Sequence, residues 1–478
     1  MKKCPKLNIK LNMPIDNFES PPNWSVLRNF SEDISGNLSY KQFLVGLGVD
    51  NQITTRIAPF TKANTLNGAT LNIDFSQETI GAITFSRASS AYRVSKLGVF
   101  ELVGNNIPRY DYNPTTLQFR GLLIEESRTN LLTYSEQFDN GAWVKFNSSV
   151  TANVATAPNG ATLADRLTDN STYARHYLLR TLSVSANTFY TLSIFAKADT
   201  NNFVSIVFGK YASPYTRGGS IVNLTTGEIT SYSSNSPLSV NRFAAEKFDN
   251  GWWRITVSVV FDTTSTDGIV EIGTLNAAIS SATYSGSGGS IYIWGAQLEV
   301  GNYPTSYIPT TTTSAIRAAD VATISSISSW YKSGQGTLGI DGYFMGSPDN
   351  NYPVFVGLTD ASTLDVIGIW NSPDNSKRIS AVIRKNVNSP TFLSAFGSAK
   401  SYGVSFSAAI RFDSYSATFA IDGELGSESF TIDLPVPTQL LIGSPQLYQT
   451  ACSYWLKRLF YMPRKVTGTE LQTLSVFY

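Results

Sequence analysis

Short runs of β-branched and aromatic residues, separated by turns rich in Gly, Asn and Ser, recur at fairly even spacing along this 478-residue chain. The clearest runs are Tyr190–Ala196, Phe203–Phe208, Trp253–Val259 and Ile291–Trp294. No long segment with helical periodicity competes with them, and this combination is typical of β-sandwich proteins. We therefore predict an all-β fold class, with one sandwich over residues 131–312.

A second series of strand-like runs predicts another β-sandwich over residues 321–478, after a threonine-rich linker at Thr310–Thr313. These runs are Gly336–Phe344, Val354–Leu358, Tyr402–Phe406 and Ser416–Ile421. Asp422-Gly423 directly follows the last run and is a strong hairpin signal. Thr467, three residues before Glu470, predicts the cap of one short C-terminal helix.

The N-terminal residues 1–62 differ from both sandwiches and are predicted to form an extended attachment arm. Leu7, Ile9, Leu11 and Met13 alternate with other residues, as in a half-buried strand, and Trp24 follows a double proline. So many apolar residues with so little core of their own indicate docking on a partner chain. The alternative is that this segment folds back on the next domain. Residues 63–130 are predicted to be a β-rich connector.

The composition excludes several classes of function. A net charge of +1 argues against nucleic acid as a partner, because phosphate binding favours a basic surface. One histidine and two cysteines leave no basis for a Cys/His metal cluster, and we expect neither a metal nor a cofactor. No apolar run reaches the roughly 18 residues of a membrane span. Lys2 and Lys3 are not followed by the apolar core of a secretory signal, so we expect release by another route, such as virus assembly and lysis.

The sequence gives little support for catalysis, and we predict no catalytic residue. Glu125 and Glu126 are adjacent in a strand and point to opposite faces, so they cannot flank one glycosidic bond, and ion pairing with arginine is the simpler interpretation. His176 is not accompanied by a Gly-x-Ser-x-Gly nucleophile motif. Gly286–Gly289 lacks the lysine and the helix of a phosphate-binding loop and is interpreted as a turn.

Some aromatic residues are candidates for stacking on a sugar ring. They are Tyr211, Tyr215, Trp252, Tyr352 and Trp370, with Arg217 as a candidate partner for hydroxyl groups. Trp252 and Trp253 face opposite sides of a strand, so one is expected in the core and the other on the far face or at a rim. Sugar sites combine exposed aromatic faces with a few hydrogen-bonding groups. Ordinary core packing and loop tyrosines remain the alternative for every candidate.

Several strings in the chain resemble a module common in phage and prophage tail proteins. They are Phe85–Ala91, Pro108–Tyr112, Gly121–Leu132, Trp294–Glu299 and Pro304–Thr311. The resemblance covers about residues 80–325 and implies a jelly roll like those of carbohydrate-binding modules. Residues 326–478 are similar, more loosely, to concanavalin-A-like or laminin-G-like sandwiches, through Phe419–Gly423, Leu441–Ser444 and Leu459–Arg464.

The resemblance implies a subunit of a bacteriophage virion, of the tail fibre, spike or adhesin type, and the lack of catalytic motifs leads us to expect a non-enzymatic one. It implies attachment to other virion proteins, for which the arm is the candidate through Leu7, Ile9, Leu11, Met13 and Trp24. It also implies a homotrimer and binding of a host surface polysaccharide. Two alternatives stay open: a capsid or tail decoration protein without a receptor, and a tailspike that depolymerises polysaccharide.

Overall fold

The structure is a computed structural model that describes residues 66–477 with ten gaps. The gaps are 211–215, 235–238, 262–265, 279–281, 347–352, 361–364, 372–377, 386–389, 396 and 444–452. The predicted attachment arm, residues 1–62, lies outside the described residues. Asn64–Tyr478 group into one compact unit.

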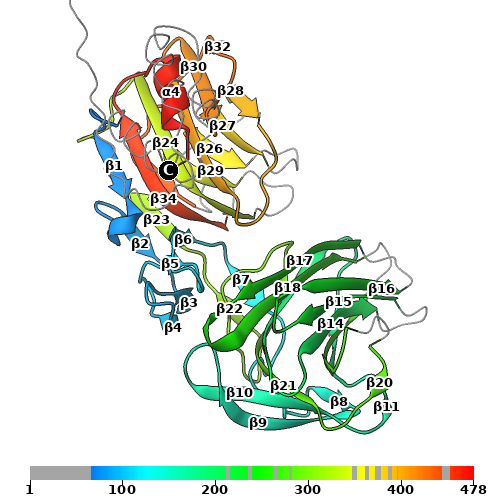
Figure 1. Cartoon of the computed structure of the whole chain (residues 1–478). Helices are drawn as coiled ribbons and strands as arrows, with labels where there is room; N and C mark the ends of the chain where they lie inside the picture. Colours follow the sequence, from blue (N-terminus) through cyan, green and yellow to red (C-terminus); the bar gives the residue numbers. More distant parts are fainter. Residues whose placement is uncertain are drawn as a thin grey trace, which may run out of the picture. The chain divides into compact units, whose positions relative to one another are not determined.

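Two six-stranded antiparallel sheets form the first sandwich (Figure 1). One sheet has the order β17 (Ser239–Lys247), β18 (Trp252–Val260), β13 (Phe189–Ala198), β21 (Ser290–Val300), β10 (Thr162–Asp169) and β9 (Ser148–Thr156). The other has the order β16 (Ile229–Ser234), β15 (Thr216–Asn223), β14 (Phe203–Lys210), β19 (Asp267–Leu275), β12 (Tyr177–Ser183) and β8 (Val144–Phe146). Alternate residues such as Val204, Ile206 and Phe208 point into the shared core, as period-two strands require.

The second sandwich has a nine-stranded and a seven-stranded sheet. The larger sheet runs β31 (Glu424–Leu425), β30 (Ser416–Ile421), β29 (Ser405–Asp413), β24 (Gln335–Gly346), β34 (Ser453–Met462), β6 (Phe119–Ile124) and β5 (Tyr110–Tyr112), with β1 (Leu71–Asp74) on β34 and β32 (Ser429–Phe430) on β30. The smaller runs β2 (Thr84–Ser86), β23 (Val321–Ile324), β33 (Gln439–Ile442), β25 (Val354–Thr359), β26 (Val366–Asn371), β27 (Ile379–Arg384) and β28 (Pro390–Ala395). One hydrophobic core lies between them. The all-β sandwich prediction is therefore confirmed.

Residues 63–130, predicted as a connector, contribute strands to both sheets of the second sandwich. β1 pairs with the C-terminal half of β34, and β6 pairs with the N-terminal part of the same strand. β2 pairs with β23. Between β2 and β5 the chain forms a hairpin of β3 (Ala91–Val94) and β4 (Phe100–Val103), whose aromatic side chains pack on the first sandwich. The first sandwich is thus inserted in the chain between strands of the second.

The chain crosses between the sandwiches through a two-stranded ribbon of β7 (Arg128–Asn130) and β22 (Ala315–Arg317). The threonine run expected as a linker begins inside the first sandwich, because the Thr310 hydroxyl donates to the Leu132 carbonyl oxygen (2.6 Å). The Thr311 carbonyl accepts from the Tyr134 amide (2.7 Å).

Helix is scarce in the described part of the chain. The α-helix α4 (Gly468–Leu474) begins with the predicted cap, in which Thr467 and Glu470 form a reciprocal capping box. Two 3-10 turns, η2 (Phe75–Gln77) and η3 (Asp249–Gly251), complete the helical elements there. None of the helices in this part has the length and hydrophobicity needed to span a membrane.

Candidate functional site

The motif strings converge on a group of fully buried charged side chains, which we call the buried ion cluster. Its members are Arg87, Arg109, Glu125, Arg317 and Asp320. Arg87 follows β2, Arg109 precedes β5 and Glu125 follows β6, while Arg317 ends β22 and Asp320 precedes β23. Strand ends of the second sandwich and of the β7–β22 ribbon therefore bring these residues together from distant parts of the sequence.

Each carboxylate in the buried ion cluster bridges two arginines. Asp320 contacts Arg87 Nη1 (3.1 Å) and Arg109 Nη2 (2.5 Å). Glu125 contacts Arg109 Nη1 (2.8 Å) and Arg317 Nε (3.4 Å). Glu125 also accepts hydrogen bonds from the amide (2.8 Å) and hydroxyl (2.7 Å) of Ser306, in the loop after β21 of the first sandwich. The cluster therefore joins the two sandwiches and leaves its charges no access to a substrate.

Electrostatics keep Glu125 ionised inside the protein. Burial alone would raise its pKa, but the charges of Arg317 and Arg109 and the hydrogen bonds from Ser306 outweigh burial and lower the pKa to about 2. The sequence predicted ion pairing with arginine for both adjacent glutamates, with Arg120 and Arg128 as the nearest candidates in the sequence. Glu126 does pair with Arg128 (2.5 Å), whereas Glu125 pairs with the more distant Arg109 and Arg317.

Acid should therefore weaken the contact that the buried ion cluster makes between the two sandwiches. The pKa of Glu125 in the folded protein lies below its ordinary value of 4.5, so its contribution to stability is complete above about pH 5 and is lost as the pH falls towards 2. Urea denaturation at a series of acidic pH values should show this slope, and Glu125→Gln should flatten it. Glu101→Gln, which changes an exposed ion pair with Arg93, should leave the slope in place.

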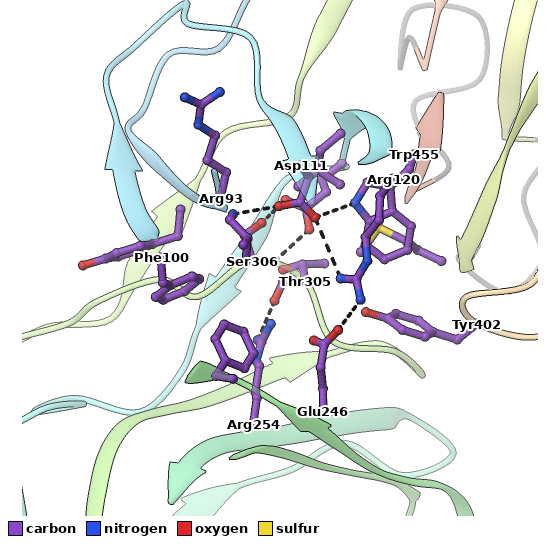
Figure 2. A pocket seen from close by; sticks show the side chains of 16 residues that line it. Arg93, Phe100, Asp111, Arg120, Glu246, Arg254, Thr305, Ser306, Tyr402 and Trp455 are labelled. Carbon is purple, nitrogen blue, oxygen red and sulfur yellow. Dashed lines mark hydrogen bonds and ion pairs between the residues drawn. The ribbon is translucent and has the colours of Figure 1, made fainter. Parts of the chain in front are cut away.

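A small cavity lies beside the buried ion cluster, where the two sandwiches meet (Figure 2). Figure 2 shows Arg120 between Asp111 (4.0 Å) and Glu246 of β17, with which it forms an ion pair. The Arg120 guanidinium also lies over the Trp455 ring, 5.0 Å from its centroid. Arg120 thus connects a strand of the first sandwich to an aromatic side chain of the second.

The carboxyl group of Asp111 gives this cavity the strongest resemblance to a catalytic site. Burial raises the pKa of Asp111 despite the facing charge of Arg120 and hydrogen bonds from Val94 and Trp455, and such shifts are frequent at active sites. The cavity has a volume of about 40 Å³, however. That is room for a few water molecules, whereas small-molecule sites span about 300–1,000 Å³. We interpret this cavity as part of the contact between the two sandwiches and not as a binding site.

A larger open groove of about 520 Å³ lies beside β7. Glu126 and Arg128 at its edge are paired with each other, and Arg128 also lies over the Tyr303 ring (4.9 Å). Phe189 is the aromatic side chain among the lining residues, and it is half-buried. The groove therefore offers little exposed ring face for a sugar.

Two of the predicted sugar-stacking residues are buried. Trp252 is 1 % exposed and donates from its indole nitrogen to the Thr156 carbonyl oxygen (3.1 Å). Trp370 is 3 % exposed. Trp252 and Trp253 do face opposite sides, but the β3–β4 hairpin covers the Trp252 side. These two predictions are wrong, because neither ring has a face in solvent.

The other predicted contact residues lie outside the described residues, except for the backbone of Arg217. Tyr211, Tyr215 and Tyr352 lie outside the described residues, as do Leu7, Ile9, Leu11, Met13 and Trp24 of the arm. The backbone of Arg217 lies in β15, opposite Gly209 of β14 and Ser234 of β16. The sugar-binding and docking roles predicted for all of these residues stay predictions.

An exposed group of aromatic residues lies instead at the β8–β12 edge of the first sandwich, and we call it the aromatic surface. Its members in contact are Phe146, Arg175 and Tyr177, and we include the exposed Tyr173, which lies two residues before Arg175 in the sequence. Phe146 and Tyr177 are paired across the strands with rings stacked at 5.0 Å and 14°, and the Arg175 guanidinium lies 4.8 Å from the Tyr177 centroid. Phe146 is 38 % exposed and Tyr173, in β11 (Tyr173–Ala174), is 73 % exposed.

Buried contacts hold the aromatic surface in position. Arg175 forms an ion pair with the buried Glu271 of β19. His176, between Arg175 and Tyr177, is buried, with Nδ1 2.7 Å from the Asn147 carbonyl oxygen and Nε2 3.3 Å from that of Tyr284. His176 therefore fixes the backbone between β11 and β12 and contacts main-chain oxygens through both ring nitrogens.

Sequence reasoning considered this segment only for His176 and missed its neighbours. Tyr173, Arg175 and Tyr177 recur with a period of two, which in an extended chain places them on one face. That period-two signal could have been used, but no comparable signal in the sequence identifies Phe146. Its pairing with Tyr177 depends on the register of β8 against β12.

No protein-family model matches the sequence, and a search of curated proteins finds no significant match. Among solved structures, a CBM40 module of a Ruminococcus gnavus IT-sialidase, bound to α2,3-sialyllactose, is similar at 15 % identity and a TM-score of 0.25, covering 30 % of this chain and 83 % of that one.

Two larger proteins are also similar in part. The enzymatically active domain of bacteriophage CBA120 tailspike protein 4 matches at 13 % identity and a TM-score of 0.24, over 36 % of this chain and 21 % of that one. Trypanosoma rangeli sialidase matches at 9 % identity and a TM-score of 0.26, over 69 % of this chain and 62 % of that one. TM-scores this low carry no argument about function, which must come from the residues of this chain.

Proposed function

We propose that this chain is a non-catalytic, adhesin-type subunit of a bacteriophage virion that binds a host surface polysaccharide through its first sandwich. The observation that carries the proposal is the aromatic surface. Phe146 and Tyr173 expose ring area to solvent, and Arg175 adds a guanidinium beside Tyr177, whose ring is stacked on that of Phe146. Apolar CH faces of sugars stack on such rings, while charged and amide groups bond their hydroxyls.

The architecture supports an adhesin with a fixed geometry. Arg87, Arg109 and Glu125 of the motif strings take part in the buried ion cluster, which joins the binding sandwich to the second sandwich. In the proposed subunit the arm at residues 1–62 attaches to other virion proteins, and a homotrimer presents several copies of the surface. Linked weak sites raise avidity by about 100-fold or more without new contacts.

Binding to polysaccharide should depend on the exposed rings. Phe146→Ala and Tyr173→Ala should each weaken binding to responsive members of a panel of purified capsular polysaccharides and O-antigens by about tenfold, since a stacked ring contributes about 0.5–1.5 kcal/mol beyond its buried area. Biolayer interferometry on immobilised polysaccharide measures this. Val154→Ala, at another exposed position of the first sandwich, should bind like the unchanged protein.

The alternatives give different results in the same assay. A decoration protein without a receptor role would bind no member of the panel. A depolymerase would release reducing ends from the polysaccharide, and a single Asp or Glu substitution would abolish that release. Undiminished binding by both aromatic variants would assign recognition to another surface.

A further inference from the structure

A second pair of exposed rings lies on the second sandwich, far from β8 and β12 in the sequence. Tyr415, in the turn between β29 and β30, is 65 % exposed, and Phe430 of β32 is 57 % exposed. Their ring centroids are 5.5 Å apart with planes at 56°. Large aromatic side chains are normally buried in soluble proteins, so a fixed and exposed pair requires an explanation.

The backbone fixes this pair in place. The Asp413 carboxylate accepts from the amides of Tyr415 (2.9 Å) and Ser416 (2.7 Å), and the Tyr415 carbonyl accepts from the Thr431 amide (2.9 Å). Phe430 lies opposite Ser416 in the β30–β32 pairing. Thr431 has a φ of +65°, a conformation that is rare for a β-branched residue. The rings are therefore held outward by their own strands.

Charged groups flank the rings. Lys465 contacts Asp413 (3.2 Å) and Glu428 (2.8 Å), and Glu428 accepts from the Ser416 hydroxyl (2.7 Å). Asp413 and Glu428 are each about one-third exposed, so part of each carboxylate faces solvent. The turn that carries Tyr415 and the strand that carries Phe430 thus also hold hydrogen-bond acceptors and a cation, which sugar hydroxyls can use.

We infer that Tyr415 and Phe430 form a second saccharide subsite, which stacks on one pyranose ring while Asp413, Glu428 and Lys465 bond its hydroxyl groups. The class of ligand, a saccharide, is taken from the proposed function, whereas the site is inferred from Tyr415 and Phe430 themselves. A protein partner fits less well, because stable interfaces bury about 1,200–2,000 Å² and their centres are depleted of Lys, Glu and Asp. Two rings bordered by such residues suit one sugar.

Fluorine NMR can observe this subsite directly. The chain, labelled with 3-fluorotyrosine, contains 24 tyrosines, so the Tyr415 signal is assigned by its loss in Tyr415→Phe. We expect that signal to shift saturably when a methyl pyranoside of glucose, galactose, mannose or N-acetylglucosamine is added at millimolar concentration. Phe430→Ala should weaken the response about tenfold, and Val436→Ala, at an exposed apolar position, should preserve it.

The response should persist in Phe146→Ala, which separates this subsite from the aromatic surface. A Tyr415 signal that no saccharide shifts would overturn the inference even if polysaccharide binding through Phe146 is present. A saturable shift without polysaccharide binding through Phe146 would support the subsite and contradict the proposed aromatic surface. If Phe430→Ala lowers the oligomeric state in sedimentation analysis, the pair is a contact between copies of the chain, and the inference is likewise overturned.

Discussion

Replacement of Asp320 by alanine should lower the free energy of unfolding by about 3–5 kcal/mol, the usual cost of removing one partner from a buried ion pair. Asp320 accepts from Arg87 and Arg109, and its Oδ2 also accepts from the Glu125 amide (2.9 Å). Its loss leaves two buried guanidinium groups short of a counter-charge. Glu125 remains beside Arg109 and compensates only part of that charge.

Urea denaturation followed by tryptophan fluorescence measures this effect. The matched control is Asp433→Ala, because Asp433 forms an ion pair with Lys385 at the surface, where such pairs contribute about 0–1 kcal/mol. Asp320→Asn keeps the shape of the side chain and tests whether the charge is the decisive property. A loss in Asp320→Ala no larger than in the control would contradict a structural role for the buried ion cluster.

Deletion of residues 1–35 should leave a folded protein that binds polysaccharide but no longer joins the virus particle. The described cores are formed by residues from Leu66 onward, so the deletion removes none of them. A segment whose sequence predicts one alternating strand and little core of its own cannot by itself offset the entropy of ordering, about 1–2 kcal/mol per residue. We therefore propose that it is ordered on another virion protein by strand addition.

For the proposed virion subunit, complementation of a phage from which the gene has been deleted, followed by quantification of the chain in purified particles, tests the arm. Ile9→Asp together with Leu11→Asp in the full-length chain should reproduce the loss, since both positions lie on the apolar face of the predicted strand. Normal incorporation of the truncated chain, or its failure to fold, would favour an arm that folds back on the next domain.

The sequence was sufficient to predict elements whose signals are local. The runs at Tyr190–Ala196 and Phe203–Phe208 lie within β13 and β14, because period-two alternation marks a strand that buries one face. Asp422 and Gly423 both have positive φ, at 50° and 81°, as the predicted hairpin turn requires. The capping box at Thr467 was likewise a signal contained within four residues.

What the sequence could not predict is which distant segments meet. Arg87 and Asp320 lie 233 residues apart, and no periodicity links them. The same limit explains the error at Trp252: alternation assigns its ring to the outer face, but only the packing of the β3–β4 hairpin determines that this face is covered. Phe146 was overlooked because the sequence does not show that no other segment covers its ring, which is 38 % exposed.

The insertion of the first sandwich within the second has a consequence for the order of folding during synthesis. Asp74 of β1 contacts Arg458 of β34, a residue 384 positions later, so the larger sheet cannot close until almost the whole chain has left the ribosome. At about 5–20 residues per second, β1 waits on the order of 20–80 s for its partner. Strands β8 to β21 pair only among themselves, which allows the first sandwich to fold while the unfinished sheet still needs protection from aggregation.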